Sequence, residues 1–115
     1  MLCLLFLKHL ICDFYLQRPY QYLNKGKYGH PGGLLHAAIH TVGSLICCIY
    51  FMNLWLLAIV LLGEFVIHYH TDWAKVNICK HFNWKMDNSE QYWWMLGVDQ
   101  TIHSLTYLVM FYACC

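Results

Sequence analysis

The sequence predicts an all-α protein built as a transmembrane antiparallel four-helix bundle. Hydrophobic residues make up 60% of the 115 residues and charged residues only 11%, whereas a soluble domain carries about 25% charged residues. A chain this short forms one domain and cannot hide so much apolar area from water. Polar loops divide it into four apolar segments, and each segment carries two ionisable side chains four residues apart. Such a pair shares one helix face, because four residues make about one turn.

The first segment predicts a helix over residues 2–17. Arg18 and Pro19 end it, because the residue before a proline disfavours helical geometry. Its apolar start lacks a preceding basic region and a small-residue cleavage site, so we expect a retained helix and not a signal peptide. Residues 18–33 then form a polar loop that contains basic residues and no acidic ones.

The next two segments predict helices over residues 34–52 and 54–81. Only a short link near Asn53 separates them, and short links join antiparallel neighbours. A second polar loop covers residues 82–91, and the last segment predicts a helix over residues 90–115. In an up-down bundle both polar loops lie on one side of the membrane, and the positive-inside rule assigns that side to the cytoplasm.

The four pairs of ionisable residues are expected to meet inside the bundle. The pairs of the first and second segments lie near the segment ends that the first polar loop joins. The pairs of the third and fourth segments lie in the halves that the second polar loop joins. An antiparallel arrangement therefore brings all four to a similar depth. Charged groups in a bilayer face the bundle interior or a cavity. The pairs are His9 and Asp13, His36 and His40, His68 and Asp72, and Asp99 and His103.

Five imidazoles and three carboxylates together predict a metal site. Such a donor set suits divalent zinc first, with iron, manganese or nickel as alternatives, and eight donors are enough for one or two ions. Gln17, Gln100 and Glu64 are expected to orient imidazoles, and Lys75 to neutralise an anionic substrate. The predicted catalytic residues are therefore Lys75, Gln100 and Glu64.

Composition also excludes some classes of protein. The formal net charge is +1 and there is no basic arm, so we expect no nucleic-acid partner. The seven cysteines are odd in number and contain no C-x-x-C motif, which argues against a disulfide framework or a cysteine-ligated zinc finger. The expected partner is the lipid bilayer, and the sequence leaves open whether the protein forms a homo-oligomer.

The order and spacing of the motifs resemble those of a known family. His9-x-x-x-Asp13-Phe14-x-x-Gln17, His68-x-x-x-Asp72-x-x-Lys75 and Asp99-Gln100-x-x-His103 are similar to the motifs of a small integral-membrane family of unknown function in bacteria and their phages. In that family a lysine follows the first motif, as Lys25 or Lys27 does here, and a helix begins with a histidine, as at His36. The resemblance implies a helical protein of the bacterial inner (cytoplasmic) membrane and brings no established activity. More distantly, the pattern is similar to membrane-bound metal-dependent hydrolases.

Three functions fit these observations. The first is a divalent-metal-dependent hydrolase acting on a phosphate or ester group, such as a lipid headgroup, at the cytoplasmic membrane face. The second is a proton or metal-ion channel or transporter, because His and Asp chains also form relays. The third is a structural or lytic phage membrane protein without metal, in which the polar pairs only hold helices together.

Overall fold

The computed structural model describes residues 1–115 and is all-α, without strands, so the predicted fold class is confirmed at that level. Five α-helices and one π-helix make up the chain. Their bounds are α1 Leu2–Leu10, the π-helix η1 Ile11–Tyr15, α2 Pro19–Tyr22, α3 Pro31–Cys48, α4 Leu54–His81 and α5 Glu90–Ala113.

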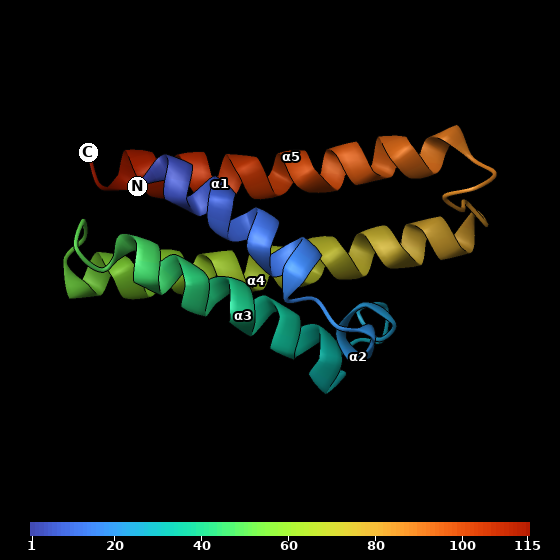
Figure 1. The fold of residues 1–115 in the computed structure, drawn as a ribbon, viewed down its shortest axis with the longest axis horizontal. Helices are drawn as coiled ribbons and strands as arrows, with labels where there is room; N and C mark the ends of the chain where they lie inside the picture. The colour runs from blue at the N-terminus through green and yellow to red at the C-terminus, as the bar shows by residue number, and fades with distance from the viewer.

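The four long segments lie side by side. Helix α1 packs against α3 and α5, and α4 also packs against α3 and α5. Figure 1 shows both termini at one end of the molecule, and α2 with the α4–α5 loop at the other. The molecule measures 45 × 26 × 22 Å along its principal axes. We call the two ends the terminal end and the loop end.

The first segment differs from the continuous helix expected over residues 2–17. It changes to a π-helix at Ile11, where the Leu16 N–H donates to the Ile11 carbonyl at 3.0 Å, and helical structure stops at Tyr15. No glycine or proline in this stretch signals the change. Single π turns occur frequently at functional sites, and this one carries Asp13 at its centre.

The other helix bounds follow from local capping. Helix α3 begins at Pro31 and not at residue 34, because proline suits the first helical position and the His30 Nδ1 accepts the Gly32 N–H at 3.0 Å. It ends at Cys48, short of residue 52. Helix α4 spans Leu54–His81, and the Asn53 side chain caps it by accepting the Leu56 N–H at 3.0 Å.

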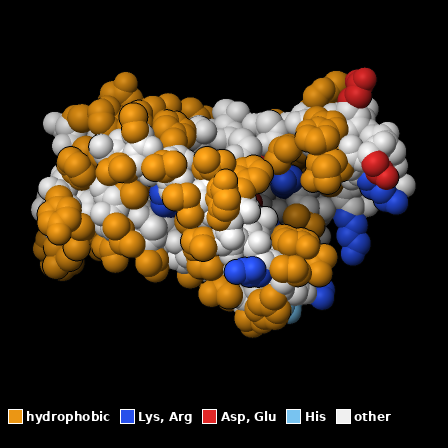
Figure 2. Space-filling model, viewed as in Figure 1, with side chains coloured by type: hydrophobic (Ala, Val, Ile, Leu, Met, Phe, Trp, Pro, Cys, Tyr) orange, Lys and Arg blue, Asp and Glu red, His pale blue; other side chains and the backbone are white.

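The distribution of polarity is inverted relative to a soluble protein. Of the 22 buried residues, 11 are polar or charged. Figure 2 shows apolar side chains over most of the visible face, with charged ones gathered towards the loop end. The apolar core is small and lies towards the terminal end; it consists of Leu5, Cys48, Leu57, Tyr107 and Met110.

Two helices, α3 and α4, are long and apolar enough to cross a membrane on length and composition. Four membrane-spanning helices were expected, and by this criterion only two qualify. Helix α1 has nine residues, and polar residues lower the mean hydropathy of α5.

Candidate metal centre

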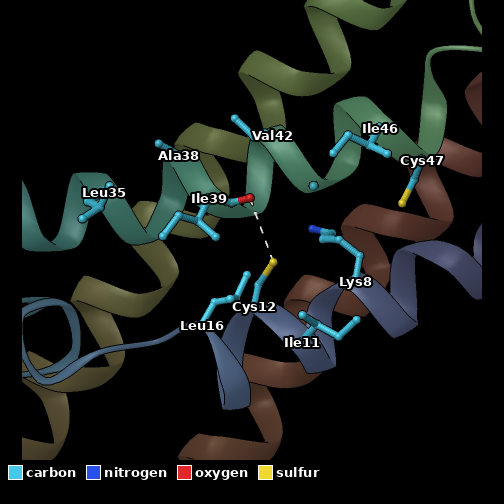
Figure 3. A pocket seen from close by; sticks show the side chains of 11 residues that line it. Lys8, Ile11, Cys12, Leu16, Leu35, Ala38, Ile39, Val42, Ile46 and Cys47 are labelled. Atoms are coloured by element: carbon cyan, nitrogen blue, oxygen red, sulfur yellow. Dashed lines mark hydrogen bonds between the residues drawn. The ribbon is translucent and has the colours of Figure 1, made fainter.

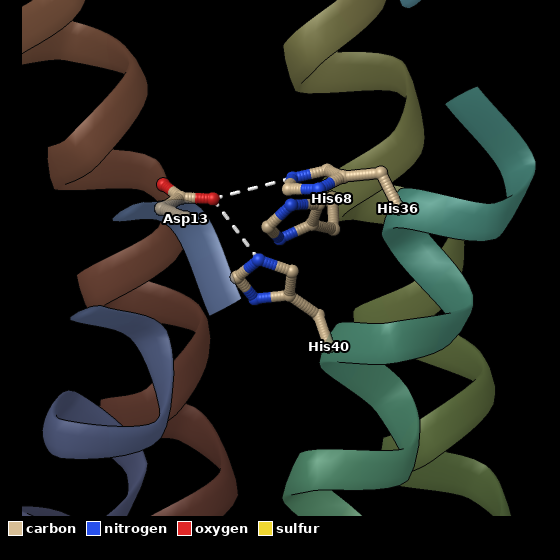
Figure 4. A group of neighbouring side chains, drawn as sticks. All are labelled: Asp13, His36, His40 and His68. Carbon is tan, nitrogen blue, oxygen red and sulfur yellow. Dashed lines mark hydrogen bonds and ion pairs between the residues drawn. The ribbon is translucent and has the colours of Figure 1, made fainter. Parts of the chain in front are cut away.

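The eight ionisable residues of the four pairs lie together in one polar cluster, as expected. Each of the four long segments contributes two of them, at the level where η1 faces the middle of α4. Figure 4 shows Asp13 from η1 turned towards His36 and His40 of α3, with His68 of α4 beside them. Seven of the eight side chains are buried and Asp13 is partly buried.

Four of these residues form the first group that could hold a metal ion. The donor atoms of Asp13, His36, His40 and His68 all lie within 4.8 Å of one another. Asp13 Oδ1 is 3.0 Å from His40 Nε2 and 3.2 Å from His36 Nε2. The group combines one carboxylate and three imidazoles, a set that zinc and related divalent ions accept.

A second group with the same spacing comprises His68, Asp72 and His103. Asp72 Oδ1 is 3.4 Å from His103 Nε2, and Asp72 Oδ2 is 3.5 Å from His68 Nε2. Because His68 belongs to both groups, the two candidate positions are adjacent. The His68 ring lies 3.9 Å from the His40 ring and 4.1 Å from the His103 ring, centroid to centroid.

Several buried nitrogen and oxygen atoms of the cluster, all possible metal ligands, make no hydrogen bond. Both ring nitrogens of His68 make no hydrogen bond, nor do Nε2 of His36 and His103 or Oδ1 of Asp99. Asp72 Oδ2 is paired with the Lys25 ammonium at 2.8 Å. His68 is only 2% exposed. Buried polar atoms are nearly always partnered, so this set fits a cation that would complete it.

The hydrogen bond of His36 supports the same interpretation. Its Nδ1 lies 3.3 Å from Gln21 Oε1, which can only accept, so Nδ1 donates this hydrogen bond. Nε2 then faces Asp13 at 3.2 Å and Asp72 at 3.3 Å. A metal ion or a proton at Nε2 would satisfy both carboxylates, and an imidazole held by its other nitrogen is typical of metal ligands.

His9 and Asp99 lie beside these groups and not in them. Both nitrogens of His9 are engaged: Nδ1 is 2.7 Å from the Tyr107 hydroxyl, and Nε2 is 3.0 Å from Gln100 Oε1. Asp99 Oδ1 is 3.3 Å from His103 Nε2. Six of the eight expected ligands therefore have metal-ligand spacing, and His9 and Asp99 surround them.

A family comparison can now be set beside this geometry. A family model described as a protein of unknown function, DUF3307, matches residues 1–115. The chain belongs to the DUF3307 family. No match was found among curated proteins or among solved structures. The resemblance to a family of unknown function is thus confirmed over the whole chain, and the family description assigns no chemistry.

The three predicted catalytic residues of this DUF3307 chain have different surroundings. The Gln100 amide donates to Asp13 Oδ2 and to Asp99 Oδ2, both at 3.3 Å. Lys75 Nζ is 3.6 Å from Asp99 Oδ2. Glu64 does not touch the two metal groups, because it accepts from Lys8 Nζ at 2.7 Å instead.

Lys8 is a central residue that sequence reasoning missed. Its ammonium also donates to the Tyr107 hydroxyl at 3.0 Å and lies 3.5 Å from His40 Nδ1. Figure 3 shows Lys8 extending from α1 towards α3 beside an apolar pocket of about 500 Å³. Gly43 makes this possible, since a Cβ there would lie 2.7 Å from the Lys8 Cγ.

Other missed residues continue the polar stripes by one helical turn. Ser44 follows His40 by four residues and donates to Glu64 at 2.8 Å. Tyr107 follows His103 by four residues. The four-residue spacing that marked the pairs could have found both. Gln21 follows Gln17 by four residues as well, but Pro19 lies between them and the expected helix ended before it.

A basic pocket opens over the centre at the loop end. It has a volume of about 470 Å³. Lys25 and Lys75 reach from it into the cluster, because Lys25 Nζ is 2.8 Å from Asp72 Oδ2 and Lys75 contacts Asp99. No acidic side chain lines it; the lining residues are Gln17, Tyr22, Lys25, Lys75, Val76, Cys79, Lys80, Trp84 and Tyr92. We call this the lysine pocket.

Proposed function

We propose that the chain is an integral membrane four-helix bundle that holds one or two divalent ions, zinc first, and hydrolyses a phosphate or ester group at the cytoplasmic membrane face. One observation carries the proposal. Buried imidazole nitrogens without a hydrogen bond and the carboxylates of Asp72 and Asp99 adjoin a pocket that three lysines line, and two of these lysines contact the carboxylates. That combination provides cation ligands and anion binding in one place.

The membrane assignment is supported by the inverted polarity. Apolar side chains cover the outside, while Lys8, Glu64 and the histidine cluster occupy the inside. Exposing this apolar surface to water would cost about 25 cal/mol of free energy per Å², whereas contact with lipid carries no such cost. Exposed aromatic side chains such as Trp93 and Trp94 at the start of α5 suit the headgroup region.

The hydrolytic chemistry follows from the donors and the lysines. A divalent ion held by the two groups would supply an activated water nucleophile and stabilise charge on the reacting oxygens. Lys25, Lys75 and Lys80 would bind the anionic phosphoryl group. The oxygen of water bonds to phosphorus, the bond from phosphorus to the ester oxygen breaks, and the released alcohol receives the proton that water loses. Gln100 holds Asp13 and Asp99 in place during this step.

A site open on one side favours hydrolysis over transport. A channel or transporter needs a polar route through the whole bundle. Here the lysine pocket opens at the loop end, while the apolar core containing Leu57, Tyr107 and Met110 closes the terminal end. An opening at one end only supports an enzyme site over a transport route.

The first test measures metal and turnover together. Protein purified in mild detergent without chelator is expected to carry one to two ions per chain and to release phosphate from a phosphomonoester. Lys75→Met is expected to lower kcat/KM at least about tenfold with the metal retained, because a charge-assisted contact to the substrate is lost. Lys27→Met is the matched control, since Lys27 is exposed and bonds only Asn24. Metal below about 0.2 ion per chain would contradict the proposal, because such sites bind tightly.

Orientation is tested separately with reporter fusions. The basic loops are proposed to be cytoplasmic, so a periplasmic alkaline phosphatase fused after Cys115 is expected to be active. The same reporter inserted after Trp84, in the α4–α5 loop, is expected to be inactive, while a fluorescent protein there should fluoresce. The reverse pattern would place the lysine pocket on the outer face.

A further inference from the structure

A second pocket adjoins the lysine pocket on the outside of the molecule. A pocket of about 330 Å³ lies between α4 and α5 and shares Lys75 with the lysine pocket. Asp99 lines it as well, and the remainder of its wall is mainly apolar. The lining residues are His70, Thr71, Ala74, Lys75, Ile78, Met95, Val98, Asp99 and Ile102.

This pocket continues into another one along the same two helices. The next pocket, of about 390 Å³, shares Ile102 with it and extends past Gly63 and Val109 towards Met110. Together they form a track that we call the α4–α5 groove. From Lys75 to Ile59 on α4 the groove covers 16 residues, or about 24 Å at the helical rise. That length exceeds the ~15 Å of one bilayer leaflet.

We infer that the substrate is a lipid with a phosphate head and one long chain, with the head in the lysine pocket and the chain in the α4–α5 groove. This inference rests on the proposed function and names its substrate class. Charge complementarity selects the head, because three lysines and no acid line the pocket. Lys25 and Lys75 are paired with Asp72 and Asp99 behind it, and Lys80 forms no ion pair. The apolar groove selects the chain, since it begins at the same Lys75 and faces the surrounding bilayer.

The other large apolar pocket does not fit this role. It lies between the first segment and α3, and its only charged residue is Lys8. This pocket shares no residue with the lysine pocket, so a chain lying in it would not extend from a head bound by Lys25 and Lys75.

Two glycines allow a matched test. Gly63 lines the groove, and a Cβ added there meets no atom within 4 Å, so a side chain can start there without a clash and Gly63→Phe is expected to fill the groove. Gly97 on α5 has equally open surroundings and lines neither the groove nor the lysine pocket. Gly97→Phe therefore controls for a bulky side chain on the lipid-facing surface.

The experiment uses the whole chain in nanodiscs of zwitterionic phospholipid. The probe is a long-chain alkyl phosphate with a photoreactive diazirine in its chain, and cross-linked residues are mapped by mass spectrometry. We expect labels on α4 and α5 at Ile67 and Ile102. Gly63→Phe should reduce them at least about tenfold, because the ring replaces the chain's apolar contacts, and Gly97→Phe should not. Excess hexadecyl phosphate should compete, and hexadecanol should not.

The outcomes separate the inference from the proposed function. Labels spread evenly over all lipid-facing helices and unchanged by Gly63→Phe would overturn the inference. If the protein then still bound metal and hydrolysed a soluble phosphomonoester, the proposed function would stand. Groove labelling that competes as expected, without any hydrolysis, would support the lipid-phosphate site and overturn the hydrolase.

Discussion

Replacing His68 by alanine is expected to abolish metal binding. His68 is the residue common to both candidate groups, and neither of its ring nitrogens has another partner. Its removal takes a donor from both positions at once. We expect metal affinity to fall by at least about 100-fold, more than the 10- to 100-fold typical for loss of a supporting residue. Element analysis and competition with a chromogenic chelator measure this directly.

The matched control is His70→Ala. His70 lies two residues further along the same helix but is exposed, and its ring contacts the Val66 carbonyl at 2.7 Å and the Tyr28 hydroxyl at 3.0 Å. This variant should keep its metal. Equal metal content in the two variants, with both folded by circular dichroism, would show that the cluster is not the binding site.

Lys8→Met is expected to give the largest loss of stability. It leaves Glu64, only 1% exposed, as a buried carboxylate with the Ser44 hydroxyl as its remaining donor. Breaking a buried ion pair from one side destabilises by about 3–5 kcal/mol. The free energy of unfolding in mixed micelles, obtained by titration with a denaturing detergent, measures the loss. Lys27→Met should change it by less than about 0.5 kcal/mol, as for other exposed positions.

The double variant Lys8→Met with Glu64→Gln separates lost pairing from lost packing. Because it removes both charges, it should recover most of the stability that the single variant loses. If the double variant is as unstable as the sum of the two single ones, the ion pair has no coupling energy. The destabilisation would then come from the Lys8 stem that passes Gly43.

Four-residue spacing predicted much of the cluster because it places two donors on the same face of each helix. Antiparallel packing then brings those faces to one depth, which is why Asp13, His36 and His68 were expected together and are found together. The spacing does not distinguish a ligand from its neighbour. His9 has the same position in its pair as His68, yet Tyr107 and Gln100 occupy both of its nitrogens.

Four-residue spacing points to one interior face per helix, and Lys8 lies off that face in the first segment. Helix α1 packs against both α3 and α5, so two of its faces are interior. His9 turns towards Tyr107 of α5, while the adjacent Lys8 reaches Glu64 of α4 past α3. The π turn at Ile11–Tyr15 could not be predicted from the sequence either, since only the backbone hydrogen bonds define it. Pro31 was assigned to a loop although it starts α3.

The ion pair between Lys8 and Glu64 joins side chains that are 56 residues apart in the chain. If the bundle forms in a bilayer, the first helix leaves the ribosome long before its counterion exists. An isolated lysine at that depth is strongly unfavourable in hydrocarbon. In that case the first helix would have to stay at the membrane surface, or beside an insertase, until the third long helix has been synthesised.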